Sequence, residues 1–124
     1  MKVFVLEDDP ARVQWLRERL IDHDLTVIDS CADVKQFQPP YDLLLLDHDL
    51  GGRQMEDHED CGETFAWLIR EHVGDADVIV HSYNWPGAMA MLAALGKGVY
   101  APFRGPYFTR LLAEAETGHA LEEV

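Results

Sequence analysis

Basic residues are scarce in this chain of 124 residues, which has 10 lysines and arginines against 23 aspartates and glutamates. The formal net charge of −13 argues against broad binding to nucleic acid, because such binding needs a basic surface. It is compatible with one phosphate in a pocket that contains a metal ion, since the ion reverses the local electrostatics. For most of these carboxylates, the simplest interpretation is solubility.

Cysteine is equally rare, and Cys31 and Cys61 are the only two. Two isolated cysteines are too few for a disulfide framework or a zinc ribbon, so we expect a chain of the reducing cytoplasm. No run of about 18 apolar residues occurs, which predicts that no segment spans a membrane. The chain starts directly with a predicted strand and shows no signal-peptide pattern.

Short apolar segments alternate with stripes of helical periodicity along the whole chain. We predict strands over residues 2–7, 25–28, 42–47, 77–82 and 99–103. We predict helices beginning at Pro10, Pro86 and Pro106, a short helix over 33–38, and a helix containing Phe65 and Ile69. Residues 48–61 are expected to form a long polar loop. This alternation predicts an α/β fold with a doubly wound, five-stranded parallel sheet, for which we choose the flavodoxin-like order 2-1-3-4-5.

The length of the chain supports one domain with one sizeable core. We predict that this domain covers residues 1–116 and that residues 117–124 form an acidic C-terminal tail that frays. The sequence shows no internal repeat, linker or low-complexity segment.

Three of the predicted strands end in polar side chains. The segments at these ends are Glu7-Asp8-Asp9, Asp47-His48-Asp49 and His81-Ser82-Tyr83-Asn84. Parallel strands deliver such ends to one edge of the sheet, so we expect Glu7, Asp8 and Asp47 to share a divalent cation. Asp49 is a further candidate ligand or a solvated acid. Mg²⁺ and Mn²⁺ are the main candidates, with Zn²⁺ allowed by the nearby histidines; the alternative is a repelling acid cluster that partly protonates.

The two histidines of these segments titrate near neutrality, so either one could move a proton during phosphodiester cleavage. His81 is our first candidate for the acid or base, and the alternative is a strand-end histidine bonded to backbone. His48 fits catalysis and an orienting role equally well. Asp47 is either a metal ligand or a nucleophile that forms an aspartyl phosphate.

Phosphate oxygens could be held by side chains near the same edge. Ser82 and Asn84 are candidates for this role through hydrogen bonds. Asn84 is equally suited to cap the helix that follows it. Arg53 is a candidate phosphate clamp on the long loop, and the alternative is a solvated charge.

Taken together, these motifs resemble the receiver domain of two-component response regulators over nearly the whole chain. The resemblance rests on Leu6-Glu7-Asp8-Asp9-Pro10, Asp47, Ser82 and Ala101-Pro102-Phe103. It implies that the acids bind a metal ion, that Asp47 accepts a phosphoryl group and that Ser82 is the switch residue. The family's lysine is replaced by Ala101 here, which leaves Arg104 or Lys97 to supply a positive charge.

Two further stretches are similar to the divergent cyclic-phosphate-processing receiver family. They are Leu46-Asp47-His48-Asp49-Leu50-Gly51-Gly52 and His81-Ser82-Tyr83-Asn84 with Pro86-Gly87-Ala88. This resemblance implies a metal-dependent phosphoesterase that processes cyclic phosphates of nucleotides or RNA ends, as in RNA repair. The alternatives are a stand-alone receiver phosphorylated on Asp47 and a non-catalytic module that binds a phosphorylated ligand or a protein partner. Receiver-like chains often dimerise, so a homodimer is a further expectation.

Overall fold

A computed structural model describes residues 1–55 and 58–118, apart from the side chains of residues 51–59. Five parallel strands form the central sheet in the order β2-β1-β3-β6-β7. Their bounds are β1 (Lys2–Leu6), β2 (Asp24–Ile28), β3 (Leu43–Leu46), β6 (Asp77–Val80) and β7 (Val99–Tyr100). Counted along the parallel strands alone, this is the predicted order 2-1-3-4-5, so the doubly wound prediction is confirmed.

The middle of the sheet is apolar on both faces. In β3 the four leucines are all buried, and they pair in register with β1 on one side and β6 on the other. Strands that are covered on both faces read as continuous apolar runs rather than as alternating patterns. The third and fourth strands were predicted to end at residues 47 and 82, whereas β3 ends at Leu46 and β6 at Val80. The backbone N–H groups of Asp47 and His81 still donate to a neighbouring strand.

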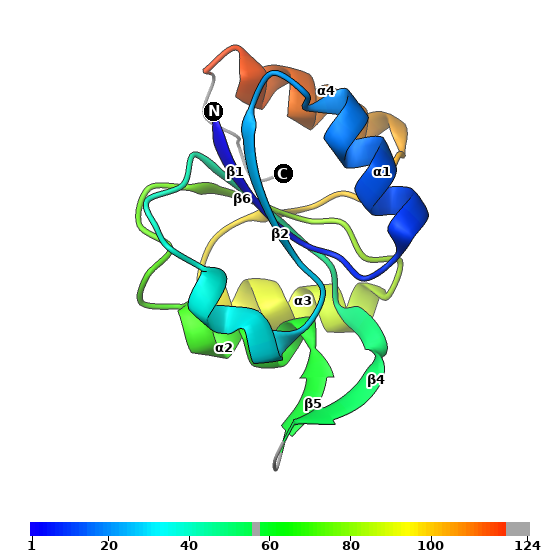
Figure 1. Cartoon of the computed structure of the whole chain (residues 1–124), viewed down its shortest axis with the longest axis vertical. Coiled ribbons are helices and arrows are strands. Elements are labelled where there is room, and N and C mark those ends of the chain that lie inside the picture. The colour runs from blue at the N-terminus through cyan, green and yellow to red at the C-terminus, as the bar shows by residue number, and fades with distance from the viewer. Residues whose placement is uncertain (56–57, 119–124) are drawn as a thin grey trace.

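Helices cover both faces of this sheet (Figure 1). On one face lie α1 (Pro10–Arg19) and α4 (Pro106–Glu116), and on the other lie the 3₁₀ helix η1 (Cys31–Gln36), α2 (Gly62–Ile69) and α3 (Trp85–Leu95). Each layer has its own core, one around Phe4 and Phe65 and one around Val5 and Phe108. None of the described helices is both long enough and apolar enough to cross a bilayer.

Side-chain caps fix where two of these helices begin, next to the strand ends that carry the polar residues. The Asp9 carboxylate accepts the backbone N–H of Ala11 at 2.8 Å and of Arg12 at 3.2 Å, which starts α1. The side-chain oxygen of Asn84 accepts the N–H of Gly87 at 3.0 Å, which starts α3. Caps of this kind satisfy backbone donors that have no partner within the helix.

The prediction of a polar loop over residues 48–61 is wrong. Two antiparallel strands, β4 (Asp49–Met55) and β5 (His58–Cys61), form a separate hairpin that projects from the body of the domain (Figure 1). Hydrogen bonds between the two backbones hold such a hairpin together. Its strands therefore do not need the run of apolar residues from which a buried strand is predicted. Residues 56 and 57, and most of the predicted acidic tail (119–124), lie outside the described residues.

Candidate functional site

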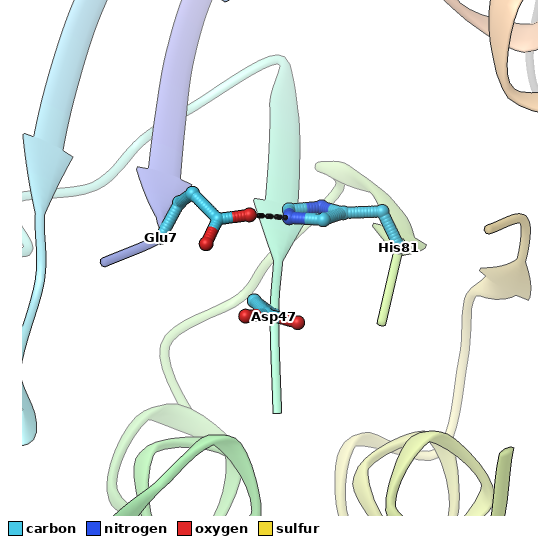
Figure 2. A group of neighbouring side chains, drawn as sticks. All are labelled: Glu7, Asp47 and His81. Carbon is cyan, nitrogen blue, oxygen red and sulfur yellow. Dashed lines mark hydrogen bonds and ion pairs between the residues drawn. The ribbon is translucent and has the colours of Figure 1, made fainter. Parts of the chain in front are cut away.

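The polar ends of three neighbouring strands meet at the carboxyl edge of the sheet. Glu7 follows β1, Asp47 follows β3 and His81 follows β6, and one ligand atom of each lies within 4.8 Å of the others (Figure 2). The backbone of Asp47 donates to Leu6 at 3.0 Å, and this bond continues the sheet pairing into the site. Hydrogen bonds of the sheet thus fix the backbone positions from which these side chains extend.

The Glu7 carboxylate is buried and accepts four hydrogen bonds. Its Oε1 accepts from His81 Nε2 at 3.0 Å and, at 3.5 Å, from Arg12 Nη1, while its Oε2 accepts the backbone N–H groups of Asp8 and Asp9. Burial alone would raise the pKa of Glu7, but the interaction with His81, the backbone hydrogen bond from Asp9 and the charge of Arg12 together hold the pKa below its usual value. Glu7 is therefore a fixed anion whose lone pairs are already used.

His81 is completely buried behind this carboxylate. Its ring packs near Phe103 and Phe108, with ring centroids 5.7 and 5.9 Å away, and among the described residues its Nδ1 has no hydrogen-bond partner. Burial lowers the pKa of His81, so its imidazole is neutral and donates through Nε2. The sequence suggested an acid or base that meets a ligand, whereas the structure has His81 hydrogen-bonded to Glu7 (Figure 2).

Asp47 is a second buried carboxylate beside the first, and only 4% of its surface is exposed. Burial, together with the negative charge of Glu7, raises the pKa of Asp47 to about 7. A carboxyl group with this pKa exchanges its proton near neutrality, and a nearby cation would favour the ionised form.

A pocket of about 230 Å³ opens at this edge, and we call it the acidic pocket. It is lined by Glu7, Asp8, Asp9, Arg12, Asp47, Asp49, Ser82 and Tyr83. All four predicted metal ligands are in this set, as is the predicted phosphate-binding Ser82. His48, His81 and Asn84 are not among the lining residues. The side chain of Arg53 lies outside the described residues.

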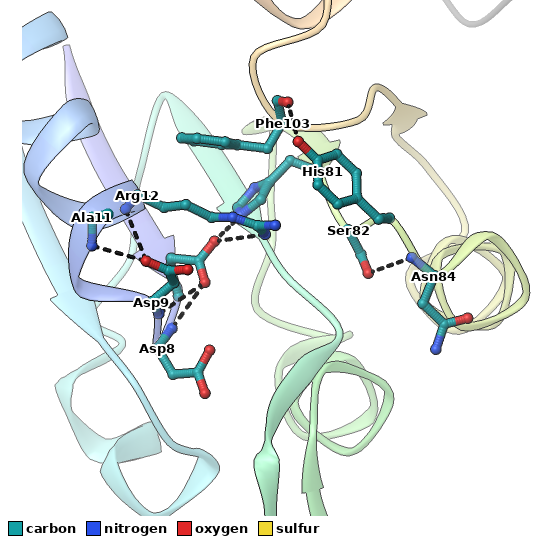
Figure 3. Close-up of polar contacts among 10 residues, drawn as sticks. Asp8, Asp9, Ala11, Arg12, His81, Ser82, Asn84 and Phe103 are labelled. Atoms are coloured by element: carbon teal, nitrogen blue, oxygen red, sulfur yellow. Dashed lines mark hydrogen bonds and ion pairs between the residues drawn. The ribbon is translucent and has the colours of Figure 1, made fainter.

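Arg12 was not predicted as a site residue, yet it is the basic residue among the described residues that line the acidic pocket. Its side chain reaches from the first turn of α1 toward the strand ends (Figure 3), and its guanidinium carbon lies 4.7 Å from the Tyr83 ring centroid and 5.2 Å from that of Phe103. The Asp9-Pro10 start of α1 was the available signal, because a residue in the first turn of that helix lies beside the strand ends. Tyr83 is held in place by a 2.9 Å hydrogen bond from its hydroxyl to the carbonyl of Phe103.

The two other cations considered for the missing lysine lie elsewhere. Lys97 Nζ donates to the carbonyl of Gly74 at 3.4 Å, and the guanidinium of Arg104 lies over the Trp15 ring at 5.8 Å. Ala101 itself is fully buried. The positive charge near Glu7 thus comes from Arg12, close to the N-terminus, and not from the segment around Ala101.

A second polar group stands beside the acidic pocket. His48 Nδ1 lies 2.8 Å from Oδ1 of Asp49, and the Asn84 amide donates to the same oxygen at 3.2 Å. The hydrogen bond with His48 lowers the pKa of Asp49, so that this acid is ionised. Asn84 does cap α3, and its backbone N–H donates to the Ser82 hydroxyl at 3.0 Å. The cap therefore positions Ser82 as well as the helix.

The set of donors in the acidic pocket fits a hard divalent cation. Mg²⁺ takes oxygen ligands, and the pocket gathers five carboxylates, those of Glu7, Asp8, Asp9, Asp47 and Asp49. His81 Nε2 is bonded to Glu7, so a nitrogen ligand for Zn²⁺ is already occupied.

Comparison with known proteins gives one family and many similar structures. The family model of the cyclic-phosphate processing receiver domain matches residues 1–97. No curated protein matches the chain in sequence.

Three of the similar solved structures illustrate the fold. The non-phosphorylated HemR receiver domain from Leptospira biflexa is 19% identical with a TM-score of 0.70, covering 98% of this chain and 95% of that chain. A two-component response regulator from Clostridium difficile is 20% identical with a TM-score of 0.70, covering 94% and 93%. The response regulator TrrA from Thermotoga maritima, in complex with Mg²⁺ and BeF, is 20% identical with a TM-score of 0.66, covering 92% and 97%.

Proposed function

The chain belongs to the family of cyclic-phosphate processing receiver domains, and from this premise we propose that it binds a divalent cation and a phosphoryl group in the acidic pocket. The observation that carries the proposal is the composition of that pocket. Carboxylates that suit a cation share it with the Arg12 guanidinium and the Ser82 hydroxyl, which suit phosphoryl oxygens. The function is that of a receiver domain whose phosphoryl acceptor is Asp47.

Asp8 and Asp47 are the residues that would hold the cation directly. Both line the acidic pocket, whereas the Glu7 carboxylate already accepts four hydrogen bonds. Carboxylate oxygens suit Mg²⁺ and Mn²⁺ alike, and Mg²⁺ is our first choice because the similar response regulator TrrA is in complex with Mg²⁺. A bound divalent cation would offset the repulsion between the phosphoryl oxygens and these acids.

In the proposed reaction, a carboxylate oxygen of Asp47 forms a bond to phosphorus while the bond from phosphorus to the donor's leaving oxygen breaks. The leaving oxygen departs with the electron pair of that bond, so the transfer needs no oxidant or reductant. Arg12 contributes the positive charge for which receiver domains of response regulators use a lysine. Ser82 offers a hydroxyl that its bond from Asn84 N–H keeps in place.

The test is phosphorylation by acetyl phosphate in the presence of Mg²⁺, followed by mass spectrometry of the intact chain. We expect the mass of one added phosphoryl group, on Asp47, and none in the Asp47→Asn variant or in EDTA. Binding of BeF₃⁻ with Mg²⁺, followed by tryptophan fluorescence, gives a second readout that needs no phosphoryl donor. Absence of both responses in the wild-type chain would contradict the proposal.

Cleavage of cyclic phosphates of nucleotides or RNA ends is the second candidate. It is favoured by the name of the matching family and by the His48, Asp49 and Asn84 group beside the acidic pocket. In this reaction water attacks phosphorus, the bond to a ribose oxygen breaks, and that oxygen takes up a proton. His48 is a better proton donor than His81, since His81 is completely buried against Glu7.

A turnover assay separates the two candidates. We would incubate 2′,3′-cyclic and 3′,5′-cyclic nucleotides with the wild-type chain and with the His48→Ala and Asp47→Asn variants, in Mg²⁺ or Mn²⁺. Metal-dependent hydrolysis that both substitutions abolish would establish a phosphoesterase. A chain that accepts a phosphoryl group on Asp47 but hydrolyses none of these substrates would be a receiver only.

A further inference from the structure

A second pocket adjoins the acidic pocket and shares Arg12 and Tyr83 with it. This arginine pocket has a volume of about 540 Å³ and is lined by Arg12, Tyr83, Pro102, Phe103, Arg104 and Gly105. Two of its described lining residues are arginines and none is an acid, although the chain has more than twice as many acidic as basic residues. A cation-binding pocket and a pocket of opposite charge thus lie next to each other.

Arg104 occupies a backbone conformation that normally selects glycine. Its φ is 62°, and the N–H of Gly105 donates to the carbonyl of Pro102 at 3.0 Å to close the turn around it. A residue with a side chain at such a turn position is strained, and glycine would relieve the strain. Its guanidinium contacts the Trp15 ring and, among the described residues, no carboxylate. An arginine in this backbone conformation points to a ligand rather than to the fold.

The N-terminus of α4 adds a third source of positive potential to the arginine pocket. Gly105 is both a lining residue and the N-cap of this helix, and no side chain caps the helix there. The first backbone N–H groups of a helix have no partner within it, and they favour an anion. Pro106 follows at the first helical position, so the turn and the helix start are fixed together.

We propose that the arginine pocket binds an oxyanion, either a carboxylate or a second phosphate, of the same small molecule whose phosphoryl group lies in the acidic pocket. This proposal rests on the proposed function for the position of the phosphoryl group. Arg12 lies between the two groups, since it lines both pockets. The ligand is therefore a small phosphate ester with a second negative charge.

The first test addresses the arginine pocket alone, by calorimetric titration of inorganic pyrophosphate in EDTA. We expect binding by the wild-type chain and a loss of about tenfold or more in the Arg104→Gly variant, as for the removal of one charged hydrogen-bonding partner. The control is Arg110→Gln, which removes the same charge from an exposed position on α4 and should bind like the wild-type chain.

Thermal unfolding of the same variants separates a ligand role from a structural one. Because glycine fits a φ of 62°, Arg104→Gly should unfold at the same temperature as the wild-type chain or higher. The proposal is overturned if the wild-type chain does not bind pyrophosphate, or if Arg104→Gly binds it as tightly as the wild-type chain does.

The second test asks whether one ligand occupies both pockets. Alkyl phosphates of increasing chain length, ending in a carboxylate, a phosphate or a neutral hydroxyl, are titrated in Mg²⁺. We expect the anionic members to bind about tenfold more tightly than the hydroxyl member at the best length, and the preference to vanish in Arg104→Gly. Equal affinities at every length would overturn the bridging ligand.

The response to BeF₃⁻ with Mg²⁺ keeps this inference apart from the proposed function. It should be the same in the wild-type chain and in Arg104→Gly, because Arg104 does not line the acidic pocket. If the wild-type chain fails to respond to BeF₃⁻ but binds pyrophosphate through Arg104, the proposed function fails and the arginine pocket stands.

Discussion

The side chains that contact the carboxylate of Glu7 are those of His81 and Arg12. His81 contributes a neutral N–H donor from inside the domain, and Arg12 contributes a charge from the side of the pocket. A neutral donor at 3.0 Å holds the geometry of the carboxylate but compensates little of its charge. The acidic pocket therefore retains most of its negative potential, which is the condition a divalent cation needs.

Removing the His81 imidazole should show how much the position of the Glu7 carboxylate depends on it. We predict that His81→Ala destabilises the domain by about 2–4 kcal/mol, because it leaves a cavity and removes one of the four hydrogen bonds to the buried Glu7 carboxylate. The affinity for Mg²⁺ should fall as well, since Glu7 loses its position. His81→Gln, which can still donate a hydrogen bond, should recover part of both losses.

Urea unfolding and Mg²⁺ titration measure the two effects. His72→Ala serves as the control, since His72 is exposed in the segment that follows α2 and should change stability by less than about 0.5 kcal/mol. An His81→Ala variant as stable as this control would show that the Glu7 contact contributes nothing.

Asp47 should make the metal-free domain less stable as the pH rises. Its pKa is about 7 in the folded chain against 3.8 for an ordinary aspartate, so the folded chain binds this proton more tightly than the unfolded chain does. The stability that the proton gives is complete below the lower value and is lost as the pH rises through about 7. Asp47→Asn should therefore stabilise the metal-free domain by roughly 1–3 kcal/mol at about pH 8, and by little below about pH 4.

Unfolding in EDTA across this pH range provides the measurement. Asp75→Asn is the matched control, because Asp75 is exposed and lies outside the acidic pocket. A constant difference between wild type and Asp47→Asn over the whole range would mean that Asp47 titrates normally.

Among the elements, α2 packs directly against the backbone of Asp47. A Cβ placed on Gly62, its first residue, would lie 2.2 Å from the Asp47 carbonyl oxygen, and the Gly62 N–H donates to the His48 carbonyl at 2.7 Å. Likewise, a Cβ placed on Gly87 in α3 would lie 2.6 Å from the His48 ring. The two glycines allow two helices to pack directly against the segment that carries Asp47 and His48.

Gly62→Ala and Gly87→Ala should differ, although alanine is favoured over glycine inside helices in general. The Cβ at position 62 would meet backbone, which cannot move aside, so we predict a loss of about 2–4 kcal/mol and weaker Mg²⁺ binding. At position 87 it would meet a side chain that can turn, so the loss should be smaller. Chemical unfolding of both variants tests the order, and a Gly62→Ala variant as stable as the wild-type chain would refute it.

The elements also show what could be predicted from the sequence. The leucine run of β3 and the Asp9-Pro10 and Asn84 caps indicated the sheet and the helix starts, because burial and capping leave direct traces in residue type. The β4–β5 hairpin left no such trace. Likewise, the sequence located His81 at a strand end, but whether its ring meets a ligand or Glu7 depends on packing against Phe103 and Phe108.

At the scale of the whole molecule, the fold concentrates charge that the sequence spreads out. The acids of the acidic pocket come from segments near residues 7 and 47, and its guanidinium comes from α1, yet all of them line one pocket of about 230 Å³. Parallel strands that end at one edge account for this convergence. The two pockets share Arg12 and Tyr83, so the carboxylates of the acidic pocket lie close to the arginines of the arginine pocket.

In a chain with a net charge of −13, added salt screens the repulsion between like charges, so specific cation binding must be distinguished from screening. We predict that Mg²⁺ raises the unfolding temperature more than NaCl of equal ionic strength does, because an ion that binds only the folded chain stabilises it by mass action. Asp8→Asn and Asp47→Asn should abolish the excess and leave the NaCl effect intact, whereas Asp75→Asn should keep both. If NaCl reproduces the Mg²⁺ effect in full, the acidic pocket acts only through its charge and holds no ion.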